Sequence, residues 1–204
     1  MSPEIEQISS IKSDKRSTGI IGLDFQLGGG IPKGKSLILF GDALSGMEIL
    51  AEQFWHADKS NESTYIMIDS LPKEGMINAG ELNISDLSAV LKGDWVVIDS
   101  LSSIILNFGI DAAVSFLDNG LAKIKNNGGN VLLILYSNVH ARADEIKVTR
   151  HSDIFISLSN VLHGNEIERN LTINKISGAD VPKRAYPYNI LASVIELSTT
   201  GRVV

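Results

Sequence analysis

The amino-acid sequence predicts an α/β fold with a mainly parallel central sheet, helices on both faces of that sheet, and antiparallel strands at the C-terminal end. The first observation behind this prediction is a set of continuously apolar runs, which are typical of parallel strands that are buried on both faces. The runs cover residues 36–40, 64–68, 95–99, 130–136 and 153–158. The second observation is that helical patterns alternate with these runs, which indicates helices that connect parallel strands.

Three helices are predicted between the strands, at residues 46–57, 84–91 and 111–126. The third ends in the turn sequence Asn-Asn-Gly-Gly, and its apolar side chains recur at helical spacing: Val114, Leu117, Leu121 and Ile124. The pattern changes after about residue 160. Residues 168–176 and 189–197 are predicted to form antiparallel strands on either side of the proline-containing loop 178–187.

Length and composition limit the possible classes of protein. A chain of 204 residues is expected to form a single domain over residues 1–204, with residues 1–16 as an N-terminal arm. The net charge of -6 makes nucleic acid an unlikely partner, because phosphate contacts need clustered Lys and Arg. There is no cysteine, no apolar signal segment and no apolar run of about 20 residues, so we expect a cytoplasmic protein without membrane association.

The most informative local feature is the loop of residues 41–48, between the first predicted strand and the first predicted helix. It has the frame of the phosphate-binding motif G-x-x-x-x-G-K-[ST], in which backbone N–H groups surround the phosphates, lysine neutralises them and the hydroxyl binds Mg²⁺. Methionine stands in the lysine position and glutamate in the hydroxyl position. The candidate nucleotide-binding residues in this loop are Gly41, Asp42, Ala43, Leu44, Ser45, Gly46, Met47 and Glu48.

The glutamate in this loop opposes a phosphate ligand. A carboxylate about 4 Å from a phosphate oxygen is repelled by roughly 4 kcal/mol at an effective dielectric constant of about 20. That corresponds to almost three orders of magnitude in affinity. In the first turn of a helix, by contrast, Glu48 is favourably placed against the positive end of the helix dipole. We therefore expect Glu48 to supply the anion that a nucleotide would otherwise bring.

Several segments resemble RecA-fold ATPases of the KaiC and RadA type. The segments Ser17-Thr-Gly-Ile-Ile-Gly-Leu-Asp24 and Leu27-Gly-Gly-Gly-Ile-Pro-Lys-Gly34 resemble the stretch that leads into the phosphate-binding loop of those proteins. Residues Trp95-Val-Val-Ile-Asp99-Ser-Leu-Ser102 are similar to the family's Walker B strand, and Asn174–Ala179 and Thr200–Val204 to the end of a KaiC domain. The resemblance covers the chain from about Ser17 and implies a RecA-like P-loop NTPase fold.

The resemblance also assigns roles to residues outside the loop. Asp99 matches the aspartate that orients Mg²⁺ in the family, and the alternative is that it caps the following helix through the N–H groups of residues 101 and 102. Asp69 lies one residue away from the position of the family's water-activating glutamate, and its side chain is shorter than that of glutamate. In the K-x-R-G segment that reaches a neighbouring subunit's nucleotide, Lys175 is retained and Ser177 replaces the arginine. Positive charge is thus missing where the transferred phosphoryl group would need it.

Other candidate sites are weaker. The histidines have no metal-ligand spacing, so no metal site is predicted. The basic residues Arg142, Lys147, Arg150, Lys183 and Arg184 have no interleaved aromatic side chains, and a solvated surface is a simpler explanation than a single-stranded nucleic-acid site.

The leading hypothesis is a catalytically inactive RecA/KaiC-like domain that acts as a regulatory or scaffolding protein-protein interaction module. Its expected partner is another protein, an active paralogue or further copies of the same chain, and no cofactor is expected. One alternative is an atypical ATPase that binds ATP and Mg²⁺ and uses Lys35 or Lys175 in place of the missing lysine. Another is a DNA-recombination accessory factor that resembles the paralogues of RadA.

Overall fold

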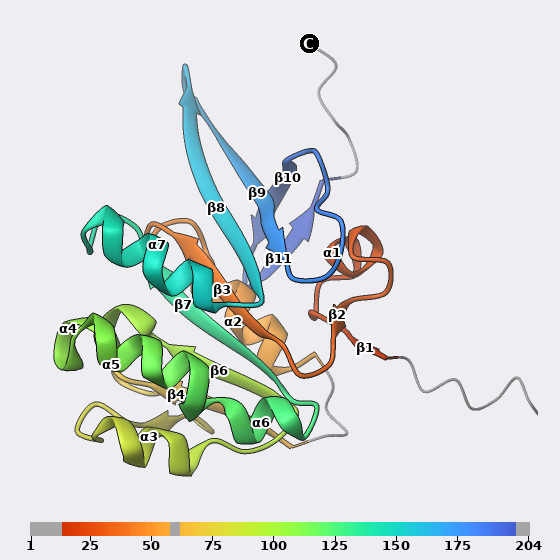
Figure 1. Ribbon diagram of the computed structural model, residues 1–204. Coiled ribbons are helices and arrows are strands. Elements are labelled where there is room, and N and C mark those ends of the chain that lie inside the picture. Colours follow the sequence, from red (N-terminus) through yellow and green to blue (C-terminus); the bar gives the residue numbers. More distant parts are fainter. Residues whose placement is uncertain (1–13, 58–61, 199–204) are drawn as a thin grey trace, which may run out of the picture.

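The computed structural model describes residues 14–57 and 62–198 (Figure 1). A sheet of nine strands runs through the molecule in the order β11-β10-β9-β8-β3-β7-β6-β4-β5. The six strands from β8 to β5 are mutually parallel, and β9, β10 and β11 are antiparallel, as predicted. The parallel strands are β3 (Ser36–Gly41), β4 (Ser63–Met67), β5 (Ile77–Asn78), β6 (Trp95–Asp99), β7 (Asn130–Tyr136) and β8 (Ile154–His163).

Both faces of the parallel sheet are covered, which explains why the strands lack polar alternation. Along β3, Leu37 and Leu39 belong to one apolar cluster and Ile38 to the other. Helix α2 (Met47–Trp55) covers the first face together with α1 (Ile21–Gln26) and the C-terminal strands. The second face is covered by α3 (Ile84–Val90), α4 (Leu101–Phe108), α5 (Ile110–Ser115), α6 (Ala122–Asn126) and α7 (Arg142–His151) (Figure 1).

The helix predicted over residues 111–126 is interrupted. The structure has α5, a π-helical segment at Phe116–Gly120, and then α6. The π turn adds one residue to the helical repeat, so that Phe116, Leu117 and Leu121 all reach the core. Gly120 permits a close approach, because a Cβ there would lie 2.5 Å from the Phe116 ring and 2.8 Å from Ser88 Oγ.

The C-terminal part differs from the prediction in the bounds and number of its strands: β8 continues to His163, and β10 begins at Tyr186, inside the predicted loop. Residues 189–197 form two strands rather than one: β10 (Tyr186–Leu191) and β11 (Val194–Leu197) pair as a hairpin, with Ala192 at a positive φ of 54° in the turn. The preceding strands β8 and β9 (Glu166–Ile176) form a long hairpin that extends beyond the rest of the sheet (Figure 1). The predicted segment Thr200–Val204 lies outside the described residues.

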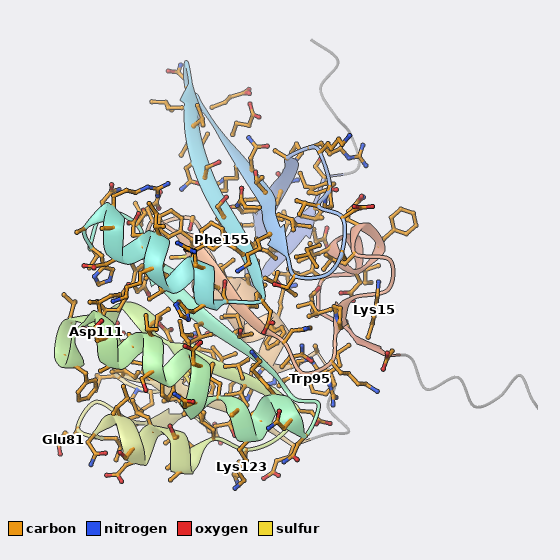
Figure 2. All side chains as sticks on the ribbon, viewed as in Figure 1. Lys15, Glu81, Trp95, Asp111, Lys123 and Phe155 are labelled. Atoms are coloured by element: carbon orange, nitrogen blue, oxygen red, sulfur yellow. The ribbon has the colours of Figure 1, made fainter. Side chains whose placement is uncertain are left out.

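The N-terminal segment is fixed to the body from Lys15 onwards. Residues 1–13 of the predicted arm lie outside the described residues, but its last two residues form β1 (Lys15–Arg16), which pairs with β2 (Ile31–Pro32). The Arg16 guanidinium lies 4.7 Å from the centre of the Trp95 ring, and Trp95 Nε1 donates a hydrogen bond to the Ser17 carbonyl oxygen (3.1 Å). Figure 2 labels Trp95 and Lys15. None of the helices in the described parts of the chain is long and apolar enough to cross a membrane.

Candidate functional site

The candidate site lies at the carboxyl ends of the parallel strands, where ligand crevices form in open α/β sheets. A cavity of about 200 Å³ opens there between α2 and the ends of β4, β6 and β7. Its lining is dominated by carboxylates and tyrosines: Glu48, Glu52, Tyr65, Met67, Asp69, Ser70, Leu71, Lys73, Asp99 and Tyr136. The structure thus brings together three residues that the sequence singled out, Glu48, Asp69 and Asp99.

The β3–α2 loop satisfies its own backbone groups. The Leu44 N–H donates to Asp42 Oδ1 (2.8 Å), and the Ser45 N–H donates to the Asp42 carbonyl oxygen (3.1 Å). Two of the amide donors that a phosphate would need are therefore used within the loop. Gly46 begins α2 with a left-handed φ of 86°, a conformation that favours glycine.

The loop is also held by the C-terminal strands. Tyr188 on β10 donates a hydrogen bond from its hydroxyl to the Ser45 carbonyl oxygen (2.6 Å), and Ser45 is fully buried. Burial raises the pKa of Tyr188 to about 12, so that this hydroxyl keeps its proton and remains a donor. The Ser45 hydroxyl donates back to the Asp42 carbonyl oxygen (2.7 Å) and is not available to a ligand.

The two residues that replace the motif's Lys and Ser/Thr point to different environments. Met47 is fully buried in the apolar cluster with α1 and the C-terminal strands. Glu48 is half-buried at the cavity and accepts a hydrogen bond from the Tyr136 hydroxyl at Oε1 (3.1 Å). Glu48 lies in the first turn of α2, as expected, and its carboxylate faces Tyr136 and the cavity. The carboxylate that accepts a hydrogen bond from a loop amide is that of Asp42.

Asp99 is the most buried acid of the site, with 2% of its surface exposed. Tyr65 donates to Asp99 Oδ2 (2.8 Å), whereas Asp99 Oδ1 has no hydrogen-bond partner. Burial raises the pKa of Asp99 to about 6 against the hydrogen bond from Tyr65, and the carboxylates of Asp69 and Glu48 raise it further. The nearby Tyr136 hydroxyl lowers the pKa of Asp99. This hydroxyl donates its hydrogen bond to Glu48.

The alternative role for Asp99, as the cap of the next helix, is not what the structure shows. The N-cap of α4 is Ser100, whose Oγ accepts from the Ser103 N–H (3.1 Å). Asp69 completes this corner, because its Oδ2 accepts hydrogen bonds from Ser100 Oγ (2.9 Å) and Ser103 Oγ (2.5 Å). Asp69 is thereby bonded to the start of α4, and Asp99 does not cap that helix.

Comparison with known proteins agrees with this architecture. The chain is 24% identical over 225 residues to the circadian clock protein KaiC3 of Synechocystis, with 87% of this chain and 44% of the relative covered. The crystal structure of a KaiC-like protein of Pyrococcus horikoshii superposes with a TM-score of 0.74 at 17% identity, covering 90% of this chain and 98% of the other. The chain has the KaiC-like RecA fold. It spans less than half the length of the curated relative, and no family model matches it.

In this KaiC-like fold, acidic side chains dominate the lining of the cavity. Four carboxylates line the cavity, from Glu48, Glu52, Asp69 and Asp99, and the one lysine in the lining, Lys73, is paired with Glu52. Within the described part of the chain, no group of three or more His, Asp or Glu side chains is arranged to hold a metal ion. A triphosphate would thus meet unbalanced negative charge.

The lysines considered as substitutes lie away from the cavity. Lys35 is at the opposite, amino end of β3, with Nζ 3.6 Å from Asp153 Oδ1. Lys175 on β9 donates to the carbonyl oxygens that end α7, at Thr149 (3.1 Å), Arg150 (3.0 Å) and Ser152 (2.5 Å). An ammonium group has three donors, so Lys175 uses them within its own chain rather than toward a neighbouring subunit. Burial lowers the pKa of Lys175.

The basic residues of α7 are partly neutralised by acids. Arg142 pairs with Glu145, and Lys147 pairs with Asp111, which Figure 2 labels near the start of α5. A shallow depression of about 600 Å³ runs along this helix and is lined by Ala143, Ile146, Lys147, Arg150 and His151. His140 precedes α7, which begins at Arg142, so His140 and Asp144 do not share a helix.

Sequence reasoning missed seven of the ten residues that line the cavity, among them Glu52, Tyr65, Lys73 and Tyr136. Tyr65 and Tyr136 lie in apolar runs and were counted as strand residues. Tyr136 nevertheless ends its strand at the carboxyl edge, where polar atoms gather in such sheets, and this position was the available signal. Glu52 lies one helical turn after Glu48, and that spacing places both on one face of α2.

Proposed function

We propose that this KaiC-like domain does not bind or hydrolyse ATP and acts as a regulatory or scaffolding protein-protein interaction module. The observation that carries the proposal is the charge of the cavity at the carboxyl ends of the strands. Among the described residues, the partners of its carboxylates are tyrosine and serine hydroxyls and one lysine, and the neighbouring loop uses two of its amides internally. Each of these features opposes a bound triphosphate. The fold itself is retained and can still serve as a scaffold.

The first test is direct calorimetric titration with Mg-ATP and Mg-ADP at pH 7.5. We expect no heat of binding at nucleotide concentrations up to about 1 mM, because a single carboxylate beside a phosphate costs roughly 4 kcal/mol at an effective dielectric of about 20. Titration with ATP in EDTA serves as the control for metal-independent binding. A dissociation constant in the micromolar range in either titration would contradict the proposal, and nucleotide turnover would replace it with the atypical ATPase.

The interaction role predicts assembly with other chains. We expect the purified protein to associate with itself or with a catalytically active KaiC-like chain, and light scattering after size-exclusion chromatography measures this directly. Exposed apolar side chains lie on α1, where Ile21 and Phe25 are 88% and 79% exposed. Ile21→Ser with Phe25→Ser removes this surface without touching the cavity. A protein that stays monomeric and does not bind active KaiC-like chains at about 100 μM would count against the interaction role.

A further inference from the structure

The cavity has the size and shape of a site for one side chain. Its volume of about 200 Å³ is below the roughly 300–1,000 Å³ of pockets that hold drug-sized ligands. Carboxylates and tyrosine hydroxyls surround the interior, while Met67 and Leu71 contribute apolar walls. Leu71 is 89% exposed, so it is available to a partner. A ligand with a charged end and an apolar stem would match this arrangement.

The deep end of the cavity has an acceptor without a donor. Asp99 is almost completely buried, and its Oδ1 has no hydrogen-bond partner among the described residues. The two tyrosine hydroxyls of the cavity donate elsewhere: Tyr65 to Asp99 Oδ2 and Tyr136 to Glu48 Oε1. A buried, unpaired carboxylate oxygen is costly to leave unsatisfied. A ligand that brings donors and positive charge would remove this cost.

From this geometry we propose that the cavity binds the ammonium or guanidinium end of a lysine or arginine side chain of a partner protein. The inference rests on the proposed function, because it specifies which chemical group of a partner protein binds in the cavity at the carboxyl ends of the strands. The charged end lies between Asp99 Oδ1, Glu48 and Asp69, and the methylene stem lies along Met67 and Leu71. The donors of such a cation match the free acceptors, and charge-assisted hydrogen bonds are about twice as strong as neutral ones. Among the described residues, no group of three or more His, Asp or Glu side chains is arranged to hold a metal ion, which favours an organic cation.

The test uses amide-capped amino acids as probes, in titrations followed by two-dimensional NMR of the full-length protein at pH 7.5. N-acetyl-lysine methylamide and N-acetyl-arginine methylamide are expected to bind saturably and to shift the amide signals of residues around the cavity. N-acetyl-norleucine methylamide has the stem of lysine without the charge, and we expect it not to bind. Asp99→Asn and Glu48→Gln are each expected to weaken binding about tenfold, in line with the loss of a charged hydrogen bond. Glu81→Gln, at an exposed acid outside the cavity (labelled in Figure 2), should leave affinity unchanged.

Affinity for the lysine probe is also expected to rise between pH 5 and pH 7. Asp99 has a pKa of about 6 in the unliganded protein and must be ionised to accept the cation. The groups that face it are Glu48 and Glu52 from α2, Tyr65 from β4, Asp69 and Lys73 after β4, and Tyr136 from β7. In Asp99→Asn, the part of the pH dependence that is centred near pH 6 should disappear.

Several results would overturn the inference. Equal binding of the norleucine probe would mean an apolar site, and tighter binding of Mg²⁺ or Ca²⁺ that depends on the same carboxylates would mean a metal site. Tighter binding of free putrescine or agmatine than of the capped probes would indicate a small-molecule ligand rather than a partner protein. Lack of saturable binding by any cation would refute the inference while leaving the proposed function in place, because the latter is decided by the Mg-ATP titration alone.

Discussion

Replacing Asp99 with asparagine is expected to raise the free energy of unfolding by about 3 kcal/mol at pH 7.5. The pKa of this carboxyl is about 6 in the folded protein against 3.8 for an unperturbed aspartate, and one pKa unit corresponds to about 1.4 kcal/mol. The folded state therefore disfavours the ionised form. Asparagine removes the charge, and its amide oxygen can still accept the hydrogen bond from Tyr65.

The same reasoning fixes the pH dependence. Because the folded protein holds the proton of Asp99 more tightly than the unfolded chain does, this group reduces stability progressively as the pH rises from about 4 to about 6, and by a constant amount above that. The stability difference between Asp99→Asn and the wild type should thus be close to zero at pH 4 and reach its full value by pH 7. Comparing the two proteins cancels the other titrating groups, including Asp153, whose pKa is lowered by hydrogen bonds with Lys125 and Ser36 against the effect of burial.

Urea denaturation followed by circular dichroism between pH 4.5 and 8 measures this difference. Glu81→Gln also removes one negative charge, but from an exposed position, and it is expected to change stability by less than about 0.5 kcal/mol. A variant Asp99→Asn that is less stable than the wild type at pH 7.5 would show that the buried carboxylate is stabilising in the free protein. In that case, the cavity would not need a cation to balance it.

The second large effect is expected at Gly30, in the Gly-Gly-Gly segment before β2. The Gly30 φ is +108°, and a Cβ at this position would lie 2.1 Å from the Arg16 carbonyl oxygen, a backbone atom of the adjacent β1 segment. Alanine there cannot be accommodated by a side-chain rotation. We expect Gly30→Ala to lower the free energy of unfolding by more than about 3 kcal/mol, since both the backbone conformation and the close approach oppose it.

Gly29 provides the matched control for this prediction. Its φ is +107°, almost equal to that of Gly30, but a Cβ at Gly29 would meet nothing within 4 Å. Gly29→Ala should therefore cost only the conformational strain, about 1–2 kcal/mol. The two variants differ only in the approach of β1, so denaturation curves for both isolate that contact. Equal losses of stability in the two would show that the packing of β1 against Gly30 is unimportant, whereas a Gly30→Ala chain that fails to fold beside a folded Gly29→Ala chain supports the prediction.

The strands of the parallel sheet could be predicted because burial on both faces leaves a direct trace in the sequence. The run from Asn130 to Tyr136 is apolar in nearly every position, and it forms β7 with the predicted bounds. The break between β10 and β11 left no such trace, because the turn places Ala192 at a positive φ where glycine or asparagine would have been the signal. The π segment within residues 111–126 was missed for a related reason, since one inserted residue hardly changes the apolar period.

Three acids of the candidate site were predictable, but the other residues and the hydrogen bonds were not. Glu48 was identified from the frame of the phosphate-binding motif, Asp69 and Asp99 from the resemblance to RecA-fold ATPases, and the structure brings all three to one cavity. The partners of each acid depend on tertiary structure: Asp42 rather than Glu48 turns toward the loop amides, and Ser100 rather than Asp99 caps α4. Such choices between neighbouring polar side chains depend on a few tenths of an ångström and on differences of about 1 kcal/mol.

The burial of Met47 has a consequence for how this sequence can change over generations. Its thioether lies within the packed interior, so a lysine at position 47 alone would place an ammonium group among apolar side chains and beside no phosphate. A threonine at position 48 alone would remove one negative charge but supply no cation. If the domain lacks ATP binding, as we propose, neither single replacement offers selection a gain in nucleotide affinity. The packing of Met47 would then hinder the gain of nucleotide binding through single substitutions.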